Sequence, residues 1–595
     1  MHNFNKFKSV LSRQYKYVRS NSSSIGAKIV YNELINKGIT LVTGYPGGAI
    51  LPVLDQFAEQ DKIRFIQNRT ESGAGSMAEG YAKATGKPGV IMVTSGPGAI
   101  NIMTCMQNAS SDGTAVMALT GQVSTAVIGT DAFQEADVIG ISKPCTKWNN
   151  QITNGTKIQS TFKTAFNKML SGRHGPVLID LPKNIMSLSY EQENVSIDES
   201  IEEGKSTIVP EDINKMINQS NRPVILAGQG VLQSGAIDLL RRIATFYNIP
   251  VTTTLMGLGV FDEKNCQSLK MIGMHGSYYA NMAIQNCDLL INFGSRFDDR
   301  IIGDPTKFAP KAKIVHVDIS SKNINKVIKA DYYINGNCKE VLHDMIEYRN
   351  SDVFEPYKFN NWHNQINQWR KVPFSYPKKN VLQGRHVIAT LNNIIQKNSI
   401  TTSYTIVADV GAHQMWAAQF IDYDYPKVKF ITSGGLGQMG FALPASMGVK
   451  MGLPTNTVIC ICGDGGFSMS FNELITAIEH KIDIKVIIIN NNYQLMVKMW
   501  QEKFYNNRII GTKMFNPPFE LMCKAMGCEA VKIDSSENLE QKLNEFLNYK
   551  GGPIVANVIT DENETVLPMV SPGKALDDMI IDENINEKFD GDAPC

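Results

Sequence analysis

The chain has 595 residues, which corresponds to roughly three to four domains of typical size. Its 58 Lys and Arg residues balance 57 Asp and Glu residues, and 43% of all residues are hydrophobic. A nucleic-acid-binding protein usually carries a basic excess, so this composition argues against that class. No apolar run reaches the about 18 residues that a membrane helix needs. The ten cysteines lack the spacing of a zinc site or a disulfide framework. We therefore expect a soluble protein with no nucleic-acid or membrane partner.

The first 23 residues differ in character from the rest of the chain. They are basic and contain no Asp or Glu, their apolar residues recur at spacings of three and four, and a Ser-rich stretch follows at 20–24. These features are typical of an organelle transit peptide, so we predict one over residues 1–23. The mitochondrion is the favoured destination and the plastid is the alternative. A basic extension that carries no targeting signal is the other interpretation.

From Ser24 onward, apolar runs alternate with helix-like segments, which is typical of parallel sheets covered by helices. Polar stretches at 190–210 and 346–380 divide these runs into three groups. The strand-like runs are 39–42, 89–93, 115–119 and 176–181, then 223–227, 289–293 and 313–317, and finally 405–408, 429–432, 457–461, 484–489 and 553–558. We therefore predict three α/β domains with doubly wound parallel sheets, at 24–190, 208–345 and 380–565, followed by a tail at 566–595.

Two polar turns follow neighbouring apolar strands in the third group. Gly463-Asp464-Gly465 ends one strand, and Asn490-Asn491 ends the next, with Asn491 lying 27 residues after Asp464. Both turns should emerge at the ligand-binding edge of a parallel sheet. Carboxylate and amide oxygens suit Mg²⁺, which also takes phosphate oxygens and water as ligands. The spacing resembles the thiamine-diphosphate motif, and two unrelated turns are the alternative.

Thiamine diphosphate also needs a carboxyl group against its aminopyrimidine ring. Glu71 stands at the predicted start of a helix, near the glycine turns at 44–48 and 95–98, and it is the candidate for this role. The alternative is that Glu71 only compensates the dipole at the helix N-terminus.

Further segments resemble one family in particular. Over about residues 24–580, the chain is similar to the catalytic large subunits of acetohydroxyacid synthase (acetolactate synthase), which are thiamine-diphosphate-dependent enzymes. The most specific segments are Gly-Thr-Asp-Ala-Phe-Gln-Glu at 129–135 and Arg-Phe-Asp-Asp-Arg at 296–300. The resemblance implies a pyrimidine-binding domain, a central FAD-binding domain and a diphosphate-binding domain, in that order. It implies thiamine diphosphate, Mg²⁺ and FAD as cofactors.

The family's reaction is a transfer that joins two pyruvates to 2-acetolactate, or pyruvate to 2-oxobutanoate, with loss of CO₂. This is the first common step of branched-chain amino-acid biosynthesis. Sites in the family form between the first domain of one subunit and the third domain of another, which implies a homodimer or tetramer. A small regulatory subunit is left open. The alternatives are another thiamine-diphosphate decarboxylase or carboligase, or a catalytically silent assembly paralogue.

The resemblance also assigns roles to single residues. The catalytic set is Glu71, Gln134, Arg300, Met439 and Trp500, with Phe133 at the mouth of the site. Arg300 offers a planar fork for a carboxylate, although it could instead pair with an aspartate of its own loop. Trp500 presents a flat apolar face that suits the extra methyl group of 2-oxobutanoate, although it could simply be a core residue.

The remaining assignments are contacts to cofactors and to the metal. The metal ligands are Asp464, Asn491 and, through its backbone carbonyl, Tyr493. The cofactor-binding residues are Tyr45, Gly47, Gly48, Ser95, Gly96, Arg173, Gly228, Gly230, Thr254, Leu255, His275, Gly276, Gly294, Arg296, Asp318, Ile319, Gly411, His413, Gly437, Gly463, Gly465 and Gly466. One departure matters below, because Thr70 stands where the family commonly has a histidine before the catalytic glutamate.

Overall fold

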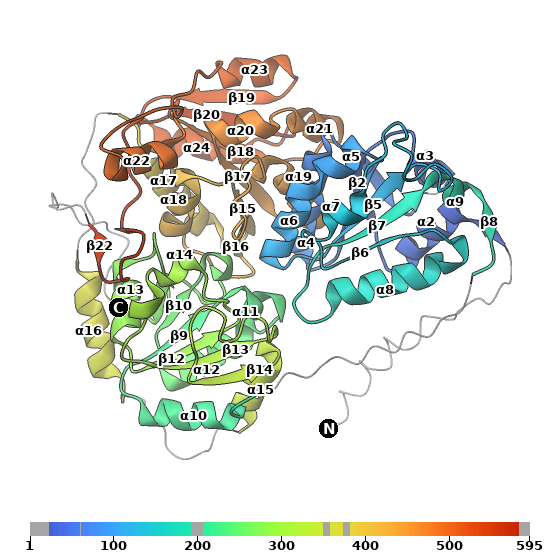
Figure 1. The fold of residues 1–595 in the computed structure, drawn as a ribbon. Coiled ribbons are helices and arrows are strands. Elements are labelled where there is room, and N and C mark those ends of the chain that lie inside the picture. The colour runs from blue at the N-terminus through green and yellow to red at the C-terminus, as the bar shows by residue number, and fades with distance from the viewer. Residues whose placement is uncertain (1–22, 60, 193–205, 349–356, 373–380, 582–595) are drawn as a thin grey trace.

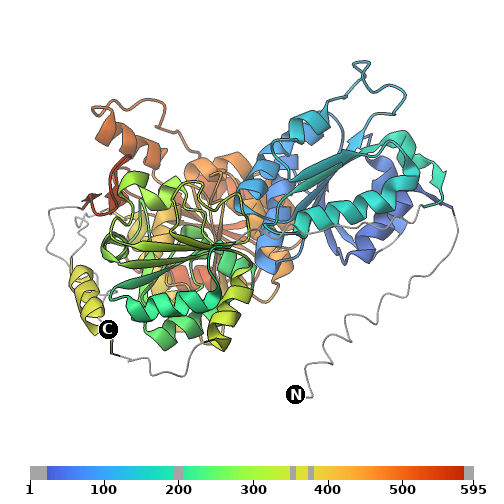
Figure 2. The ribbon, with the colours of Figure 1, turned by 60° about the horizontal axis from the view of Figure 1, so that its bottom comes forward.

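The computed structural model describes residues 23–59, 61–192, 206–348, 357–372 and 381–581. The transit peptide predicted over 1–23 lies almost entirely outside these residues, as does the end of the predicted tail. The described chain folds into three units, each built on one six-stranded parallel sheet (Figure 1). In a view turned by 60°, the first unit, coloured blue to cyan, stands to one side of the other two (Figure 2). The three predicted α/β sheets are thereby confirmed.

The first unit carries the sheet with strand order β3-β2-β4-β5-β7-β6. Its strands are β2 (Leu41–Tyr45), β3 (Arg64–Gln67), β4 (Gly89–Val93), β5 (Val116–Gln122), β6 (Trp148–Gln151) and β7 (Val177–Pro182). Its helices are α2 (Gly26–Asn36), α3 (Leu51–Glu59), α4 (Glu71–Thr85), α5 (Pro97–Asn101), α6 (Met103–Asp112), α7 (Val138–Ser142), α8 (Ile158–Leu170) and α9 (Lys183–Ser187). Short strands β1 (Ser24–Ile25) and β8 (Ser189–Tyr190) pair antiparallel where this unit begins and ends.

The second unit carries the sheet β11-β10-β9-β12-β13-β14. Its strands are β9 (Pro223–Ala227), β10 (Val251–Thr253), β11 (Ser268–Met271), β12 (Leu289–Phe293), β13 (Lys313–Asp318) and β14 (Tyr332–Asn335). Its helices are α10 (Pro210–Gln219), α11 (Gln229–Gln233), α12 (Ile237–Tyr247), α13 (Tyr278–Asn286), α14 (Asp299–Ile302), α15 (Cys338–Glu347) and α16 (Asn360–Arg370).

The third unit carries the sheet β16-β15-β17-β18-β20-β19. Its strands are β15 (Tyr404–Ala408), β16 (Val428–Thr432), β17 (Thr457–Gly463), β18 (Lys485–Asn490), β19 (Glu529–Ile533) and β20 (Ile554–Ile559). Its helices are α17 (Gly384–Asn398), α18 (Ala412–Phe420), α19 (Ala442–Gly452), α20 (Asp464–Ser470), α21 (Glu473–Glu479), α22 (Leu495–Phe504), α23 (Phe519–Ala525) and α24 (Leu539–Asn548). The antiparallel pair β21 (Met569–Val570) and β22 (Met579–Ile580) follows it.

The order of strands differs between the units in a way that bears on ligand binding. When the strands of each sheet are numbered along the chain, the first and third sheets read 2-1-3-4-6-5, and the second reads 3-2-1-4-5-6. The second order is that of dinucleotide-binding folds. In every doubly wound sheet, the strand order reverses at one point, and the carboxyl ends of the two central strands there form a crevice. These points are β2/β4, β9/β12 and β15/β17.

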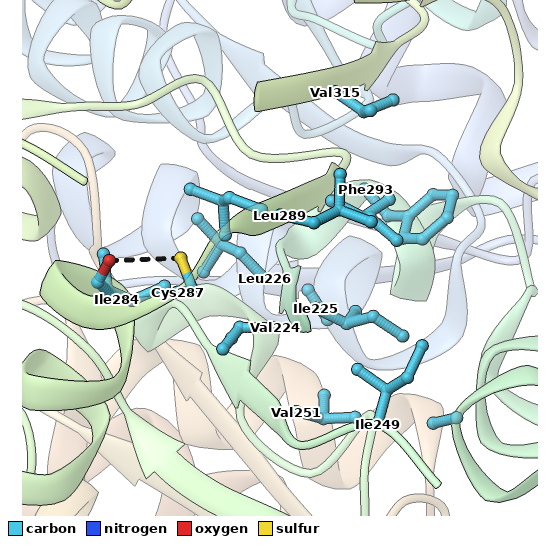
Figure 3. Packing of buried hydrophobic residues seen from close by; sticks show 14 of the residues in the cluster. Val224, Ile225, Leu226, Ile249, Val251, Ile284, Cys287, Leu289, Phe293 and Val315 are labelled. Atoms are coloured by element: carbon cyan, nitrogen blue, oxygen red, sulfur yellow. Dashed lines mark hydrogen bonds between the residues drawn. The ribbon is translucent and has the colours of Figure 1, made fainter. Parts of the chain in front are cut away.

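Central strands are mostly apolar because helices cover both faces of each sheet. All five residues of β9 and of β12 are buried. Figure 3 shows this packing, in which Val224 and Ile225 of β9 lie among Leu289, Phe293 and Val251 of the neighbouring strands. Burial of this kind, at about 25 cal/mol per Å² of apolar surface, is what holds each unit together.

Two features of the fold were missed from the sequence. Within the three parallel sheets, six strands were not predicted. Five of them, namely β3, β6, β11, β14 and β19, lie at sheet edges, where mixed polar patterns replace the continuous apolar run. The polar stretch at 346–380 also contains helix α16, which buries Trp362 and Ile366 against the second unit. Their spacing of four residues is a helical signal that the polar composition concealed. None of the described helices has both the length and the apolar character that crossing a membrane requires.

Candidate cofactor and active site

The glycine turns singled out from the sequence lie at the three crevices. At β2/β4, a Cβ on Gly47 would stand 2.5 Å from the Cβ of Thr94. At β9/β12, a Cβ on Gly228 would stand 2.3 Å from the carbonyl oxygen of Gly294. At β15/β17, a Cβ on Gly463 would stand 3.0 Å from the ring of His413. Glycine at these positions therefore allows each turn to pack closely against its neighbour.

A cavity of about 1240 Å³ joins the crevices of the second and third sheets. It exceeds the usual volume of a pocket for one drug-sized ligand, about 300–1,000 Å³. Of the residues predicted for the site, it is lined by Arg173, Gly230, Thr254, Leu255, His275, Gly294, Arg296, Arg300, Asp318, Ile319, Gly411, His413, Gly437, Met439, Gly463, Asp464, Gly465, Gly466, Asn491, Tyr493 and Trp500. Residues from three separate stretches of sequence therefore share one chamber.

The predicted metal ligands lie at the carboxyl ends of β17 and β18, which are paired in parallel. Asp464 and Asn491 are both buried and face the cavity. Burial raises the pKa of Asp464 to about 6, and no ion pair with a cation is formed by it among the described residues. A buried carboxylate without a cationic partner fits a site that receives a metal ion. Among the described residues, no group of three or more His, Cys, Asp or Glu is arranged to hold a metal ion.

His413 was predicted to contact a cofactor, and the structure shows what holds its ring. Its Nε2 atom accepts a hydrogen bond of 3.1 Å from the backbone N–H of Gly463. Burial lowers the pKa of His413 to about 3, so the imidazole is neutral at physiological pH. The ring thus fixes the start of the Gly463-Asp464 turn and presents no positive charge to a diphosphate.

The chamber's second half has the chemistry of a flavin dinucleotide site. Arg173 and Arg296 line it together, and the charge of Arg296 adds to burial in lowering the pKa of Arg173. Guanidinium groups are planar donors that bind phosphate by charge-assisted hydrogen bonds, so the pair suits the phosphates of a dinucleotide. Asp318, which ends β13, is buried at the same chamber and accepts hydrogen bonds from Ser320 N and Asn323 Nδ2. With the 3-2-1-4-5-6 strand order, these residues fit FAD.

His275 shows how the third unit closes on this half. Its Nδ1 donates to the carbonyl of Pro568 at 3.2 Å, and burial lowers the pKa of His275 to about 4. The neutral ring leaves its Nε2 atom available to the chamber. Two predicted contacts do not reach the chamber, because Gly228 packs under the β12 turn and Gly276 packs against Ile272 and Gly273.

The residues predicted to recognise the second substrate lie at the outer part of the chamber. Arg300 is mostly exposed, and its Nε atom lies 3.6 Å from Asp299 Oδ2, so the loop-internal pairing raised from the sequence is present. The Arg300 guanidinium nevertheless lines the chamber. Trp500 on α22 lies edge-on to Phe504 with ring centroids 5.3 Å apart, and it lines the chamber as well.

The candidate residues of the first sheet form a separate cluster. Glu71 is the first residue of α4, and its carboxylate accepts a hydrogen bond of 3.1 Å from Asn101 Nδ2. None of the predicted residues Tyr45, Gly47, Gly48, Glu71, Ser95, Gly96 and Gln134 lines the chamber. Phe133 and Tyr45, beside this cluster, are 88% and 37% exposed. Within one chain, Glu71 therefore lies outside the chamber that Asp464 lines.

Several residues that shape the site were missed from the sequence. Asp409 follows β15 directly, and its carboxylate accepts hydrogen bonds of 3.0 Å from the backbone N–H groups of Gly440 and Ala442, which follow Met439 in the chain. Burial raises the pKa of Asp409 to about 6. Asn516 donates to Asp464 Oδ2 at 2.7 Å. Asp409 could have been found from the sequence, because it is a carboxylate one residue after a predicted strand. No local pattern indicates Asn516.

Three family models match the chain. They are the thiamine pyrophosphate enzyme N-terminal TPP binding domain over residues 25–141, the central domain over 211–345 and the C-terminal TPP binding domain over 409–558. The three-sheet fold is thus that of a thiamine pyrophosphate enzyme.

Curated relatives narrow this class. The chain is 41% identical to the mitochondrial acetolactate synthase catalytic subunit of Saccharomyces cerevisiae over 577 residues, which cover 93% of this chain and 83% of the relative. It is 40% identical to the mitochondrial acetolactate synthase of Schizosaccharomyces pombe over 597 residues, covering 96% and 88%. It is 38% identical to the acetolactate synthase large subunit of Pyropia yezoensis over 585 residues, covering 94% and 96%. The chain belongs to the acetolactate synthase catalytic subunit family.

Proposed function

We propose that the chain is an acetolactate synthase that joins two pyruvates, or pyruvate and 2-oxobutanoate, with loss of CO₂. The observation that supports this function is that one chamber is lined by Asp464 and Met439 and also by Arg300 and Trp500. The last two are the residues predicted to recognise the second keto acid. A simple decarboxylase needs no anchor for a second keto acid. Thiamine diphosphate, when bound, supplies the electron sink that allows a 2-keto acid to lose CO₂.

The chain's residues would divide the remaining work. Asp464, Asn491 and the Tyr493 carbonyl would hold Mg²⁺, whose charge would offset that of the diphosphate. Met439, which lines the chamber next to the turn that Asp409 holds, would contact the cofactor. Glu71 would supply the carboxyl group that exchanges a proton with the aminopyrimidine ring. Arg300 binds the carboxylate of the second keto acid by charge-assisted hydrogen bonds. FAD would be held by Arg173, Arg296 and Asp318 and takes no net part in oxidation.

The position of Glu71 supports a site shared by two copies of the chain. Glu71 lies outside the chamber lined by its own Asp464, and its unit carries exposed apolar side chains such as Phe133. A second copy that buries this surface would bring its chamber to Glu71. We therefore propose that the functional unit is at least a homodimer. A regulatory subunit and a mitochondrial location are proposed from the relatives, whose names call them catalytic subunits and mitochondrial.

A complementation experiment tests the function and the shared site together. Glu71→Gln and Asp464→Ala chains should each be inactive as homodimers. When the two are co-expressed and the mixed dimer is isolated, one of its sites carries both lesions and the other carries none, so acetolactate formation should return. If both lesions act within one chain, the mixed dimer stays inactive. If either homodimer has native activity, the assignment of that residue is wrong.

A further inference from the structure

The strongest unassigned feature of the chain is a buried carboxylate that reaches from the third unit into the first. Glu473 is the first residue of α21 and has no exposed surface. It lies nine residues after Asp464. No ion pair to it exists among the described residues, although a buried carboxylate normally requires a cation or a full set of hydrogen bonds.

Glu473 obtains that set from the segment that precedes Glu71. Its Oε1 atom accepts from Arg69 N at 3.0 Å, from Thr70 N at 2.9 Å and from Thr70 Oγ1 at 3.1 Å. Its Oε2 atom accepts from Asn68 Nδ2 at 3.0 Å and from Thr476 Oγ1 at 2.9 Å. Four of these five donors belong to three consecutive residues of the first unit, so one carboxylate fixes the entire turn before α4.

Thr70 connects the Glu473 contacts to helix α4. It is the N-cap of α4, and its Oγ1 atom accepts a hydrogen bond of 2.9 Å from Gly73 N while donating to Glu473. Glu71 follows Thr70 directly as the first helical residue. The position of the Glu71 carboxyl group is therefore set by a cap that is itself bonded to the third unit. Threonine is a better N-cap than the histidine common at this position, so the departure has a structural basis.

The close approach of Glu473 also depends on a glycine. A Cβ on Gly73 would stand 2.0 Å from Glu473 Oε1, so no other residue at 73 leaves the carboxylate in place. The turn before α4 has a second contact with α21, because Arg69 forms an ion pair with Glu479 at the other end of that helix. Helix α4 also packs along α19 of the third unit, so the contact belongs to a rigid interface.

We propose that Glu473 is a positioning residue that acts through Thr70 to set the Glu71 carboxyl group against the cofactor's aminopyrimidine ring. The proposal rests on the proposed function, since Glu71 acts on thiamine diphosphate. A displacement of about 1 Å at a catalytic group can lower a rate by about 100-fold. Loss of the Glu473 contacts should therefore impair activation of the cofactor more than its binding.

The variants for the test are Glu473→Gln and Thr70→Val, with Thr70→Ser as the conservative rescue and Glu537→Gln, an exposed position on the same unit, as control. Backbone amide exchange of the cofactor-free protein comes first. We expect residues 68–74 to lose protection in Glu473→Gln and Thr70→Val, and to keep it in Thr70→Ser and Glu537→Gln. Native protection of this segment in both of the first two variants would overturn the proposal.

The second readout is the exchange of the thiazolium C2 proton of bound thiamine diphosphate for deuterium, without substrate and at saturating cofactor. Glu473→Gln and Thr70→Val should slow this exchange about 10- to 100-fold, with little change in the half-saturating cofactor concentration. A purely structural contact would lower thermal stability or cofactor affinity and leave the exchange rate native, which would overturn the proposal. If Glu473→Gln does not fold, the result for Thr70→Val alone supports or overturns the proposal.

The failure of the proposed function is distinguishable from the failure of this inference. If the native chain does not accelerate the exchange over free cofactor, the thiamine-dependent function is wrong and the role of Glu473 falls with it. If the native chain accelerates the exchange and both variants match it, only the role of Glu473 is wrong.

Discussion

Asp112 at the end of α6 is bonded to Gly435 of the third unit, with the Gly435 N–H donating to Asp112 Oδ1 at 2.6 Å. The Gly434 N–H donates to the other oxygen of the same carboxylate, and Lys83 pairs with it at 2.7 Å. Lys83 also pairs with Glu79 and donates to the carbonyl of Thr432. This buried cluster ties the glycine turn that lines the chamber to two helices of the first unit.

The first prediction is that Asp112→Ala destabilises the chain. The substitution leaves the N–H groups of Gly434 and Gly435 unsatisfied and removes one of the two anions that compensate Lys83. Removing one partner of a buried ion pair costs about 3–5 kcal/mol, so the thermal midpoint should fall by several degrees. The control is Asp55→Ala, at an exposed position on α3, which should leave the midpoint unchanged. Equal midpoints for the two variants would show that the cluster contributes nothing.

The second prediction concerns the metal corner. Asp464→Ala removes one of the two side-chain oxygens that face the diphosphate position, so binding of thiamine diphosphate should lose its dependence on Mg²⁺. Cofactor binding, followed by intrinsic tryptophan fluorescence over a Mg²⁺ titration, measures this. Asp238→Ala, an exposed change on α12, is the matched control. Unchanged half-saturation for both metal and cofactor would contradict the assignment of Asp464.

The third prediction concerns the flavin half of the chamber. Arg296→Ala should weaken FAD binding about 10- to 100-fold, because a charge-assisted hydrogen bond contributes about 1.5–3 kcal/mol. The loss should be visible as released flavin fluorescence when the purified protein is diluted. Arg300→Ala, in the same loop and mostly exposed, should retain flavin. Retention by both variants would place the phosphates of FAD elsewhere.

Some of these features could be predicted from the sequence and others could not. Apolar runs predicted the central strands β4, β9 and β12 with their observed bounds, because strands buried on both faces carry a continuous signal. The Asp464 and Asn491 turns could be placed together because parallel strands end at one edge. Glu473 could not be predicted, since its partners in the first unit are more than 400 residues away in the sequence. The separation of Glu71 from the chamber is likewise a property of the folded chain.

The fourth prediction is a pH dependence of stability. Burial raises the pKa of Glu263 from an ordinary 4.5 to about 8; the group accepts from Tyr423 N, and its other oxygen has no hydrogen-bond partner. Between these values, the folded chain keeps a proton that the unfolded chain releases. The contribution of this carboxyl to stability is therefore greatest below about pH 4.5 and is lost as the pH rises to about 8.

Glu263→Gln should remove this part of the pH dependence. The difference in thermal midpoint between variant and native chain should shift in favour of the variant between about pH 5.5 and about pH 8.5. Differential scanning fluorimetry at the two pH values measures it. An identical difference at both would show that Glu263 is ionised to the same extent in the folded and unfolded chains.

The central claim is that the chamber joins two keto acids, and the most direct measurement is the product formed from pyruvate alone. The purified chain is incubated with pyruvate, Mg²⁺, thiamine diphosphate and FAD, and acetolactate is converted to acetoin by acid and measured by its colour reaction, with acetaldehyde assayed in parallel. We predict one acetolactate for every two pyruvates consumed, and no acetolactate when thiamine diphosphate or Mg²⁺ is left out. Acetaldehyde as the product would make the chain a simple decarboxylase, and unconsumed pyruvate would make it a silent paralogue; either result contradicts the account.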